Sequence, residues 1–148
     1  MAMKWTEMMH YMHNGQVAIF IILLIYAALM DIKTRTIPDH IPLLIFMMGW
    51  VGMEPISSIL GVVFVPLPYF IMALLKENSM GGGDIKLMGA CGFYLGLQAG
   101  FVASILGLVF ALIIHINYSM ISGKKINTSI PLAPYLGAGC IVAHLMVR

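Results

Sequence analysis

The segment Met80-Gly81-Gly82-Gly83-Asp84-Ile85-Lys86-Leu87 places three consecutive glycines and a carboxylate at the start of an apolar stretch. Acidic side chains are rare in this chain, because only 9% of its 148 residues are charged. An ionisable group at the edge of hydrocarbon is costly and is a functional candidate by default. The glycines allow a sharp backbone bend and a close approach by another chain. We therefore predict that Asp84 is catalytic and that Gly81, Gly82 and Gly83 contact a substrate.

A second polar segment, Met30-Asp31-Ile32-Lys33-Thr34-Arg35-Thr36-Ile37-Pro38-Asp39, follows the apolar run 17–30. Taken alone, Asp84 could simply cap the N-terminus of its helix. A carboxylate at the matching position Asp31 favours a pair instead, and we predict that Asp31 and Asp84 form a catalytic dyad. Asp39 is the alternative to Asp31 as the first member of the dyad, or it caps the next helix. With Lys86, Asp39 is also a candidate substrate contact, although Lys86 could equally anchor to lipid headgroups.

The composition places the chain among membrane proteins. Hydrophobic residues make up 61% of it and its mean hydropathy is +0.97, whereas a soluble domain is about 45–50% apolar and about 25% charged. The net charge of +2 is too small to suggest a nucleic-acid partner. We expect an all-α, polytopic protein that forms one domain over residues 1–148 within the lipid bilayer. The sequence leaves its oligomeric state open.

Apolar runs separated by polar loops predict about six transmembrane helices. They cover residues 17–30, 41–53, 56–75, 85–98, 101–117 and 130–147. Residues 1–16 show apolar side chains at roughly helical spacing, which is typical of an amphipathic helix at a membrane interface.

Prolines and glycines indicate where these spans bend and pack. Pro66 and Pro68 are expected to kink or unwind the third span. The turn between the fourth and fifth spans is expected at Gln98-Ala99-Gly100. Gly89, Gly92 and Gly96, three and four residues apart, favour close helix packing.

The basic residues predict the orientation. With the N-terminus outside, six of the eight Lys and Arg residues fall in cytoplasmic loops, as the positive-inside rule requires. Two spans separate Asp31 from Asp84, and an even number of crossings returns the chain to the same side. We therefore expect both carboxylates at the cytoplasmic edge of the cell membrane, at similar depth.

Two adjacent carboxylates suit peptide hydrolysis. They cannot both ionise cheaply, so the pair shares a proton. The ionised member can take a proton from water while the protonated member donates to the substrate carbonyl. This chemistry needs neither a metal nor another cofactor, and we predict none. His10 and His13 lack an obvious third ligand, and Cys91 and Cys140 are expected to be small buried hydrophobes.

Together, these residues resemble those of a known family. Asp31-x-x-x-Arg35-x-Ile37-Pro38-Asp39, then Gly81-Gly82-Gly83-Asp84-x-Lys86-Leu87, and the late Pro131-Leu132-Ala133-Pro134-Tyr135-Leu136 resemble the type IV prepilin peptidases and the archaeal preflagellin peptidases. These are intramembrane aspartyl proteases of the G-x-G-D class. The resemblance implies that Asp31 and Asp84 are the catalytic pair. It also implies a substrate with a short basic leader, such as a type IV pilin, Tad pilin, pseudopilin or preflagellin precursor, cut on the cytoplasmic side.

The resemblance also implies a difference from the longer bacterial members, which carry an N-terminal extension with paired cysteines and an N-methyltransferase activity. Residues 1–16 contain no cysteine, so we expect a peptidase without the methyltransferase. A small channel or transporter and a catalytically silent pilus assembly factor are the alternatives. The spans carry almost no ionisable groups at mid-depth, which disfavours transport, and the intact Asp31 and Asp84 disfavour a silent protein.

Overall fold

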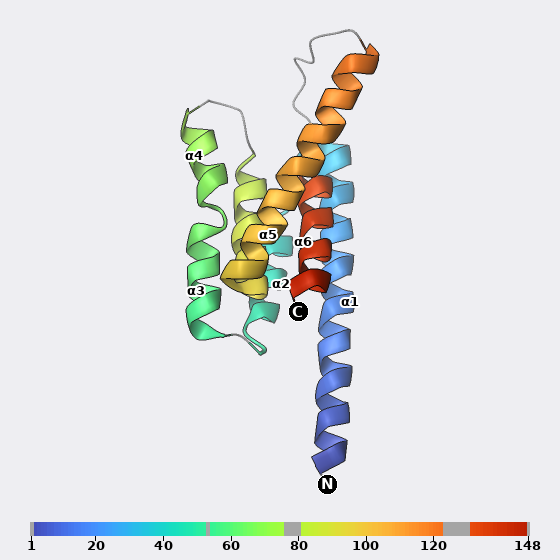
Figure 1. The fold of residues 1–148 in the computed structure, drawn as a ribbon, viewed down its shortest axis with the longest axis vertical. Coiled ribbons are helices and arrows are strands. Elements are labelled where there is room, and N and C mark those ends of the chain that lie inside the picture. Colours follow the sequence, from blue (N-terminus) through green and yellow to red (C-terminus); the bar gives the residue numbers. More distant parts are fainter. Residues whose placement is uncertain (1, 53, 76–80, 123–130, 148) are drawn as a thin grey trace.

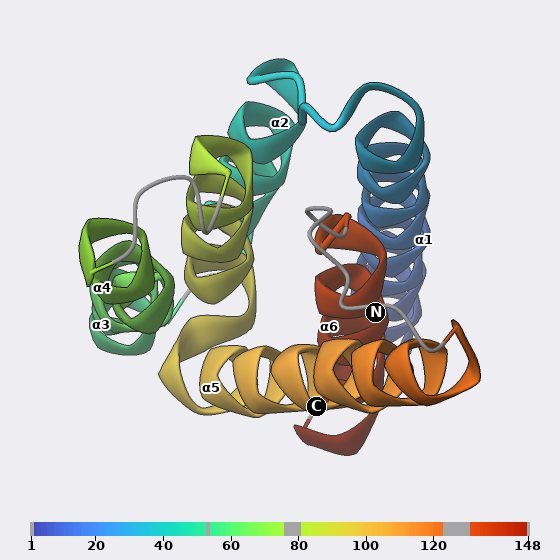
Figure 2. The ribbon, with the colours of Figure 1, turned by 90° about the horizontal axis from the view of Figure 1, so that it is seen from above.

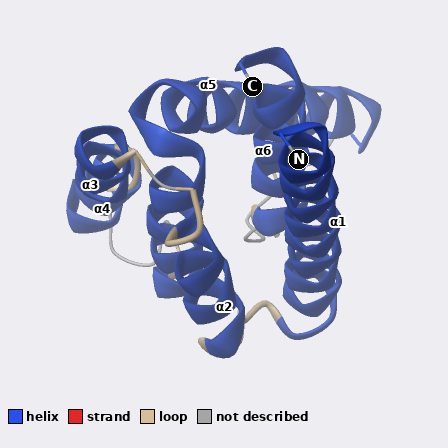
Figure 3. Ribbon diagram, turned by 90° about the horizontal axis from the view of Figure 1, so that it is seen from below, coloured by secondary structure: helices blue, strands red, loops and turns tan. Residues whose placement is uncertain are grey.

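The computed structural model describes residues 2–52, 54–75, 81–122 and 131–147. Within these ranges the chain is all-helical and contains no strand (Figures 1 and 3). The helices are α1 (Ala2–Thr34), α2 (His40–Gly49), α3 (Pro55–Phe64), α4 (Leu67–Leu75), α5 (Gly82–Ser122) and α6 (Ala133–Val147). This confirms the predicted all-α class.

Three helical stretches of the described chain are long and apolar enough to cross a membrane. They are Tyr11–Thr34, Pro55–Leu75 and Gly82–Tyr118. Helices α2 and α6 are apolar but shorter. The 10 residues of α2 span about 15 Å at 1.5 Å per residue, about half of the hydrocarbon thickness. Length and composition therefore give three spans where the sequence predicted about six.

The first span continues directly from the N-terminal segment. Residues Ala2–Thr34 form a single helix of 33 residues, because nothing in this stretch breaks a helix except the isolated Gly15. Residues 2–16 of the predicted amphipathic segment are therefore helical but do not form a separate element.

The two prolines of the third predicted span interrupt it as expected. Helix α3 ends at Phe64 and α4 begins at Leu67, because Pro66 has no N–H to donate and its ring clashes with the preceding turn. The last turn of α3 closes with the Val65 N–H donating to the Gly61 carbonyl at 3.1 Å.

Helix α5 consists of two segments that meet at Gly96, which has φ 81° and ψ 178°. In Figure 1, segment 82–95 runs away from the upper end of the molecule and segment 97–122 returns toward it. Figure 2 shows the two segments at a steep angle to each other. The second segment starts with the Leu97 N–H donating to Ser57 Oγ at 3.0 Å. The predicted turn at Gln98-Ala99-Gly100 is therefore wrong by two residues. A positive φ needs glycine, and here Gly96 bends the chain.

Small residues bring α3 and α5 into backbone contact. A Cβ on Gly61 would lie 2.1 Å from the Gly92 carbonyl oxygen, and a Cβ on Gly92 would lie 2.4 Å from the Gly61 oxygen. The predicted packing role of Gly92 is thus confirmed. Gly89 sits more loosely, because its nearest neighbour would be Pro66 at 3.7 Å.

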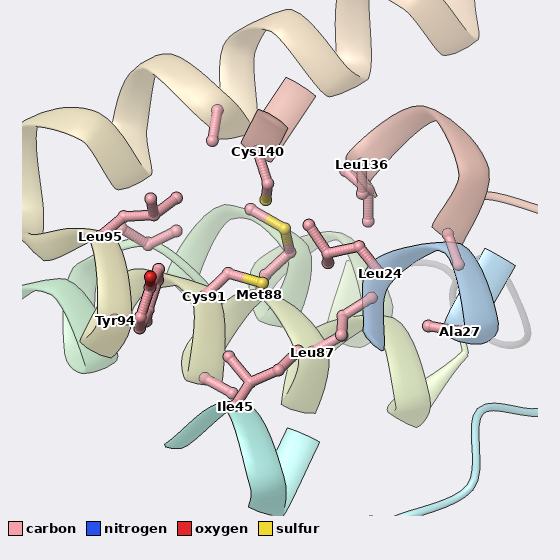
Figure 4. Close-up of a cluster of buried hydrophobic side chains, with 14 of the residues drawn as sticks. Leu24, Ala27, Ile45, Leu87, Met88, Cys91, Tyr94, Leu95, Leu136 and Cys140 are labelled. Atoms are coloured by element: carbon pink, nitrogen blue, oxygen red, sulfur yellow. The ribbon is translucent and has the colours of Figure 1, made fainter. Parts of the chain in front are cut away.

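The core lies between α1, α2, the first segment of α5, and α6 (Figure 4). Cys91 of α5 and Cys140 of α6 both lie fully buried in this core. Both cysteines are free and buried, as expected for small hydrophobes. By contrast, large apolar side chains such as Leu112 and Ile113 are exposed on the outside of α5, which is the pattern of a surface that faces lipid.

Candidate active site

Asp31 lies in the last full turn of α1. This helix ends at Thr34, where the Arg35 N–H donates to the Asp31 carbonyl at 2.9 Å and Arg35 adopts a left-handed φ of 53°. The Asp31 side chain is only 6% exposed. The carboxylate therefore points into the protein from a rigid helix, although a polar loop follows only four residues later.

Asp84 lies in the first turn of α5. Its N–H donates to the Gly81 carbonyl at 3.1 Å, so the glycine segment forms the turn that starts the helix. The Asp84 side chain is 8% exposed. Its Oδ1 is buried and accepts no hydrogen bond from the part of the chain that the structure describes. A buried carboxylate oxygen without a donor is costly and calls for an explanation.

The fold brings these two carboxylates together. Asp31 interacts electrostatically with Asp84, although they are far apart in the sequence. The loop after α1 packs on the glycine segment, because a Cβ on Gly83 would lie 3.0 Å from Cβ of Ile37. Gly83 thus lets the two motif segments approach closely, as a larger residue there would force Ile37 to move.

A backbone group of α6 holds Asp31 in place. The Ala133 N–H, at the start of α6, donates to Asp31 Oδ2 at 2.9 Å across a sequence separation of 102 residues. The first N–H groups of a helix have no partner within the helix and readily bind carboxylates. This contact was not predicted from the sequence. The only available signal was the position of Pro131 and Pro134, which mark the beginning of the last span.

Asp39 and Lys86 meet outside the buried pair. Lys86 Nζ donates to Asp39 Oδ1 at 2.8 Å, and both side chains are exposed. Asp39 occupies the N-cap position of α2, but its side chain makes no capping hydrogen bond, so the predicted alternative of a helix cap is wrong. The ion pair links the two motif segments on their solvent-exposed side.

The remaining candidates lie apart from this site. No group of three or more metal-ligating side chains occurs among the residues whose side chains are described. His13 stacks on His144 of α6 with ring centroids 6.0 Å apart, far along α1 from Asp31. The side chain of His10 is outside the described part of the structure.

Comparisons with known proteins match the chain to a family and to two curated proteins. A model of the type IV leader peptidase family matches residues 18–116, a range that includes Asp31, Asp39 and Asp84. The prepilin leader peptidase/N-methyltransferase of Bacillus subtilis (strain 168) is 31% identical over 140 residues, which are 86% of this chain and 54% of that protein. The protein of the same name from Neisseria gonorrhoeae is 31% identical over 108 residues, 63% of this chain and 38% of that protein.

The chain therefore spans about half the length of the first of these relatives and less of the second. No solved structure matches it. The family model covers about two thirds of the sequence, and the resemblance noted from its motifs is confirmed. This chain belongs to the type IV leader peptidase family.

Proposed function

We propose that the protein is an intramembrane aspartyl endopeptidase that removes the short basic leader of prepilin-like precursors. The observation that carries this proposal is the buried pair of Asp31 and Asp84, which come from two helices and interact with each other. Buried carboxylates are seldom tolerated in an apolar protein unless they have a function. The names of the two curated relatives support the class of substrate.

The surroundings of the two carboxylates differ, and this difference suggests their roles. The Ala133 N–H donates to Asp31 Oδ2, and a donor of this kind stabilises negative charge on a carboxylate. Asp84 Oδ1 has no such donor within the described chain. We assign Asp31 as the base and protonated Asp84 as the acid.

In the proposed reaction, Asp31 takes a proton from a water molecule as the water oxygen attacks the scissile carbonyl carbon. Asp84 gives its proton to the carbonyl oxygen, and a tetrahedral intermediate forms. The carbon–nitrogen bond then breaks, the leaving nitrogen receives the proton that Asp31 holds, and Asp84 recovers its proton from the intermediate's hydroxyl. Both carboxyls return to their starting states, so no cofactor is consumed.

The glycine segment and the outer ion pair are proposed to bind the substrate. Gly81 and Gly82 leave space beside Asp84, because a Cβ on Gly82 would meet no atom within 4 Å and one on Gly81 would meet only Asp84 Oδ2, at 3.3 Å. An extended peptide could therefore lie against this backbone. Asp39 and Lys86 are exposed beside it, and Asp39 offers a negative charge to a basic leader.

Asp39→Asn is expected to raise KM for a basic-leader precursor about threefold to fivefold while kcat stays nearly constant. The loss of one exposed charge interaction, roughly 1 kcal/mol, sets this size. Lys86→Met, which removes the partner that holds Asp39, should raise KM less. Steady-state cleavage measured at low and high salt gives both constants, and Glu54→Gln, at the far end of the molecule, is the matched control. A loss of kcat of roughly 10³-fold in Asp39→Asn would instead make Asp39 a member of the dyad.

The proposed topology has six spans, an outside N-terminus and an active site that faces the cytoplasm at the cell membrane. The start of α5 and the end of α1 lie toward one end of the molecule, whereas the α2–α3 connection and the C-terminus lie toward the other (Figure 1). This arrangement supports α2 as a short crossing or re-entrant element that carries the chain between the two sides.

Labelling of introduced cysteines tests the topology. Lys33 and Val51 are both exposed, one on each side of α2, and the native cysteines are buried. A membrane-impermeant maleimide should label Val51→Cys in intact spheroplasts and Lys33→Cys only in inside-out vesicles. Labelling of both sites from the same side would rule out a crossing by α2 and with it the six-span plan.

The function itself is tested with membranes that contain the chain and a prepilin-like precursor encoded in the same genome. The wild-type protein should release the leader, and mass spectrometry should place the cut at the junction of leader and hydrophobic helix. The double variant Asp31→Asn/Asp84→Asn is the blank. Intact precursor after incubation with wild-type membranes, for every prepilin-like protein of that genome, would refute the proposed function.

A further inference from the structure

Helix α6 lies between two neighbours, the second segment of α5 and helix α1 (Figure 2). A Cβ on Gly139 of α6 would meet Ala103 and Gly107 of α5. A Cβ on Gly137 would instead lie 3.7 Å from Cβ of Leu24 on α1, which is an ordinary van der Waals distance. Residues two apart are separated by about 200° around a helix, so the two glycines lie on nearly opposite faces of α6. A movement of α6 away from α5 is therefore a movement toward α1.

The contact between α6 and α5 is made by backbone atoms and leaves no space. A Cβ on Gly139 would collide with the Ala103 carbonyl oxygen and would lie 2.6 Å from the Gly107 nitrogen. In the other direction, a Cβ on Gly107 would lie 2.9 Å from Cα of Leu136. Backbone atoms cannot make room by changing a rotamer, so a methyl group at either glycine must displace a helix.

The same helix carries the donor to one carboxylate of the pair. The Ala133 N–H, at the start of α6, donates to Asp31 Oδ2 of α1 at 2.9 Å, and Ala133 is fully buried. Gly139 follows Ala133 by six residues, about 9 Å along one continuous helix. Close-packed interiors transmit strain over such distances, so a displacement at Gly139 reaches the amide of Ala133. The hydrogen bond to Asp31 then weakens, because its strength depends steeply on length and angle.

We propose that Gly139 is a positioning residue for Asp31. By letting α6 lie directly on the backbone of α5, it sets the distance between the Ala133 N–H and the carboxylate that takes the proton from water. Gly139 acts through Ala133 and not on the substrate. This inference rests on the proposed peptidase function, and it extends the site from the two motif segments to the contact between α5 and α6.

Gly139→Ala tests the proposal, because its methyl group should push α6 away from α5. The kcat for leader removal should fall about tenfold, since a hydrogen bond to a charged group is worth roughly this factor or more. KM should stay unchanged, because no substrate contact is lost. The pH profile of kcat should also be displaced, because the Ala133 N–H is one of the groups that stabilise the charge on Asp31. Steady-state cleavage over a range of pH measures all three quantities.

Gly137→Ala is the matched control, since it makes the same substitution two residues away on the same helix. Its methyl group would meet Leu24 at an ordinary distance, so kcat, KM and the pH profile should keep their wild-type values. Melting temperatures in detergent show how much stability each variant loses. A Gly139→Ala protein that melts earlier but keeps the wild-type kcat and pH profile would overturn the proposal.

Ala133→Pro removes the proposed intermediary directly. Proline has no N–H and is tolerated at the first position of a helix, which Ala133 occupies in α6. The kcat and the pH profile of this variant should change in the same direction as in Gly139→Ala and by at least as much. Adding Gly139→Ala to Ala133→Pro should lower kcat no further, because both changes break one interaction. Fully additive losses would show that Gly139 does not act through Ala133.

The remaining outcomes are also decisive. If Gly139→Ala does not accumulate in the membrane, Gly107→Ala decides, because its Cβ approaches the backbone of α6 from the side of α5. A wild-type kcat and pH profile in that variant would refute the inference. If Ala133→Pro does not accumulate, the comparison of Gly139→Ala with Gly137→Ala decides alone. Failure of the proposed function looks different, because cleavage would then survive in the Asp31→Asn/Asp84→Asn double variant or be absent from the wild-type protein.

Discussion

The variants Asp31→Asn and Asp84→Asn should each lower the rate of leader removal by roughly 10³-fold or more. General acid–base catalysis contributes about 10²–10⁴-fold per group, and each aspartate has a separate part in the proposed reaction. Asparagine keeps the size of the side chain but can neither take a proton from water nor donate one as a carboxylic acid does. The measurement is single-turnover cleavage of the precursor by equal amounts of membrane-inserted protein.

The matched control for this prediction is Glu54→Gln. It makes the same carboxylate-to-amide change on an exposed side chain and should cleave at the wild-type rate. The double variant should be no slower than either single variant, because residues that act as one unit have non-additive effects. Leader removal that survives in one single variant would exclude that aspartate from the dyad.

Gly61→Ala should lower the melting temperature by about 10 °C, the second large effect expected. Its new Cβ would lie 2.1 Å from the Gly92 carbonyl oxygen, with the Gly92 carbonyl carbon at 2.8 Å. Because these are backbone atoms, α3 and α5 must separate to make room. Overpacking costs about 1–3 kcal/mol, and the upper value corresponds to about 10 °C in a chain of this size.

Gly15→Ala is the control, because it makes the same change where no clash is expected. A Cβ on Gly15 would meet no atom within 4 Å, and alanine in a helix is favoured over glycine by about 1 kcal/mol. This variant should therefore keep or raise the melting temperature. Scanning fluorimetry of both proteins in the same detergent makes the comparison. If the Gly61→Ala protein melts within about 2 °C of the wild type, a shift much smaller than expected, then α3 and α5 do not cross at this pair.

The sequence was sufficient for the features that depend on free energies of transfer from water. Carboxylates at the edge of an apolar run are so costly that Asp31 and Asp84 stand out in the sequence as functional candidates. The two predicted crossings between them would put both carboxylates on the same side of the membrane, and this topology stays a prediction. The break at Pro66 was also predicted, from the missing N–H of proline and the clash of its ring with the preceding turn. These features depend on residue type and order alone.

Other features depend on packing, which residue types leave ambiguous. Gly92 and Gly96 look alike in the sequence, yet one lets α3 approach and the other bends α5. The donor to Asp31 is the amide of Ala133, and a backbone group has no residue type that could reveal it. The contact of Tyr69 with Ser104 could not be predicted either, because the bend at Gly96 sets the direction of the helical segment that carries Ser104.

The bond from Ala133 to Asp31 also bears on how the protein is made. Ribosomes synthesise Asp31 first and Asp84 next, but the amide that orients Asp31 belongs to the last helix of the described chain. A nascent chain that has inserted α1 to α5 already contains both carboxylates, yet Asp31 still lacks this donor. The arrival of α6 would complete the geometry, so that proteolytic competence would begin only when synthesis of this unit is nearly finished.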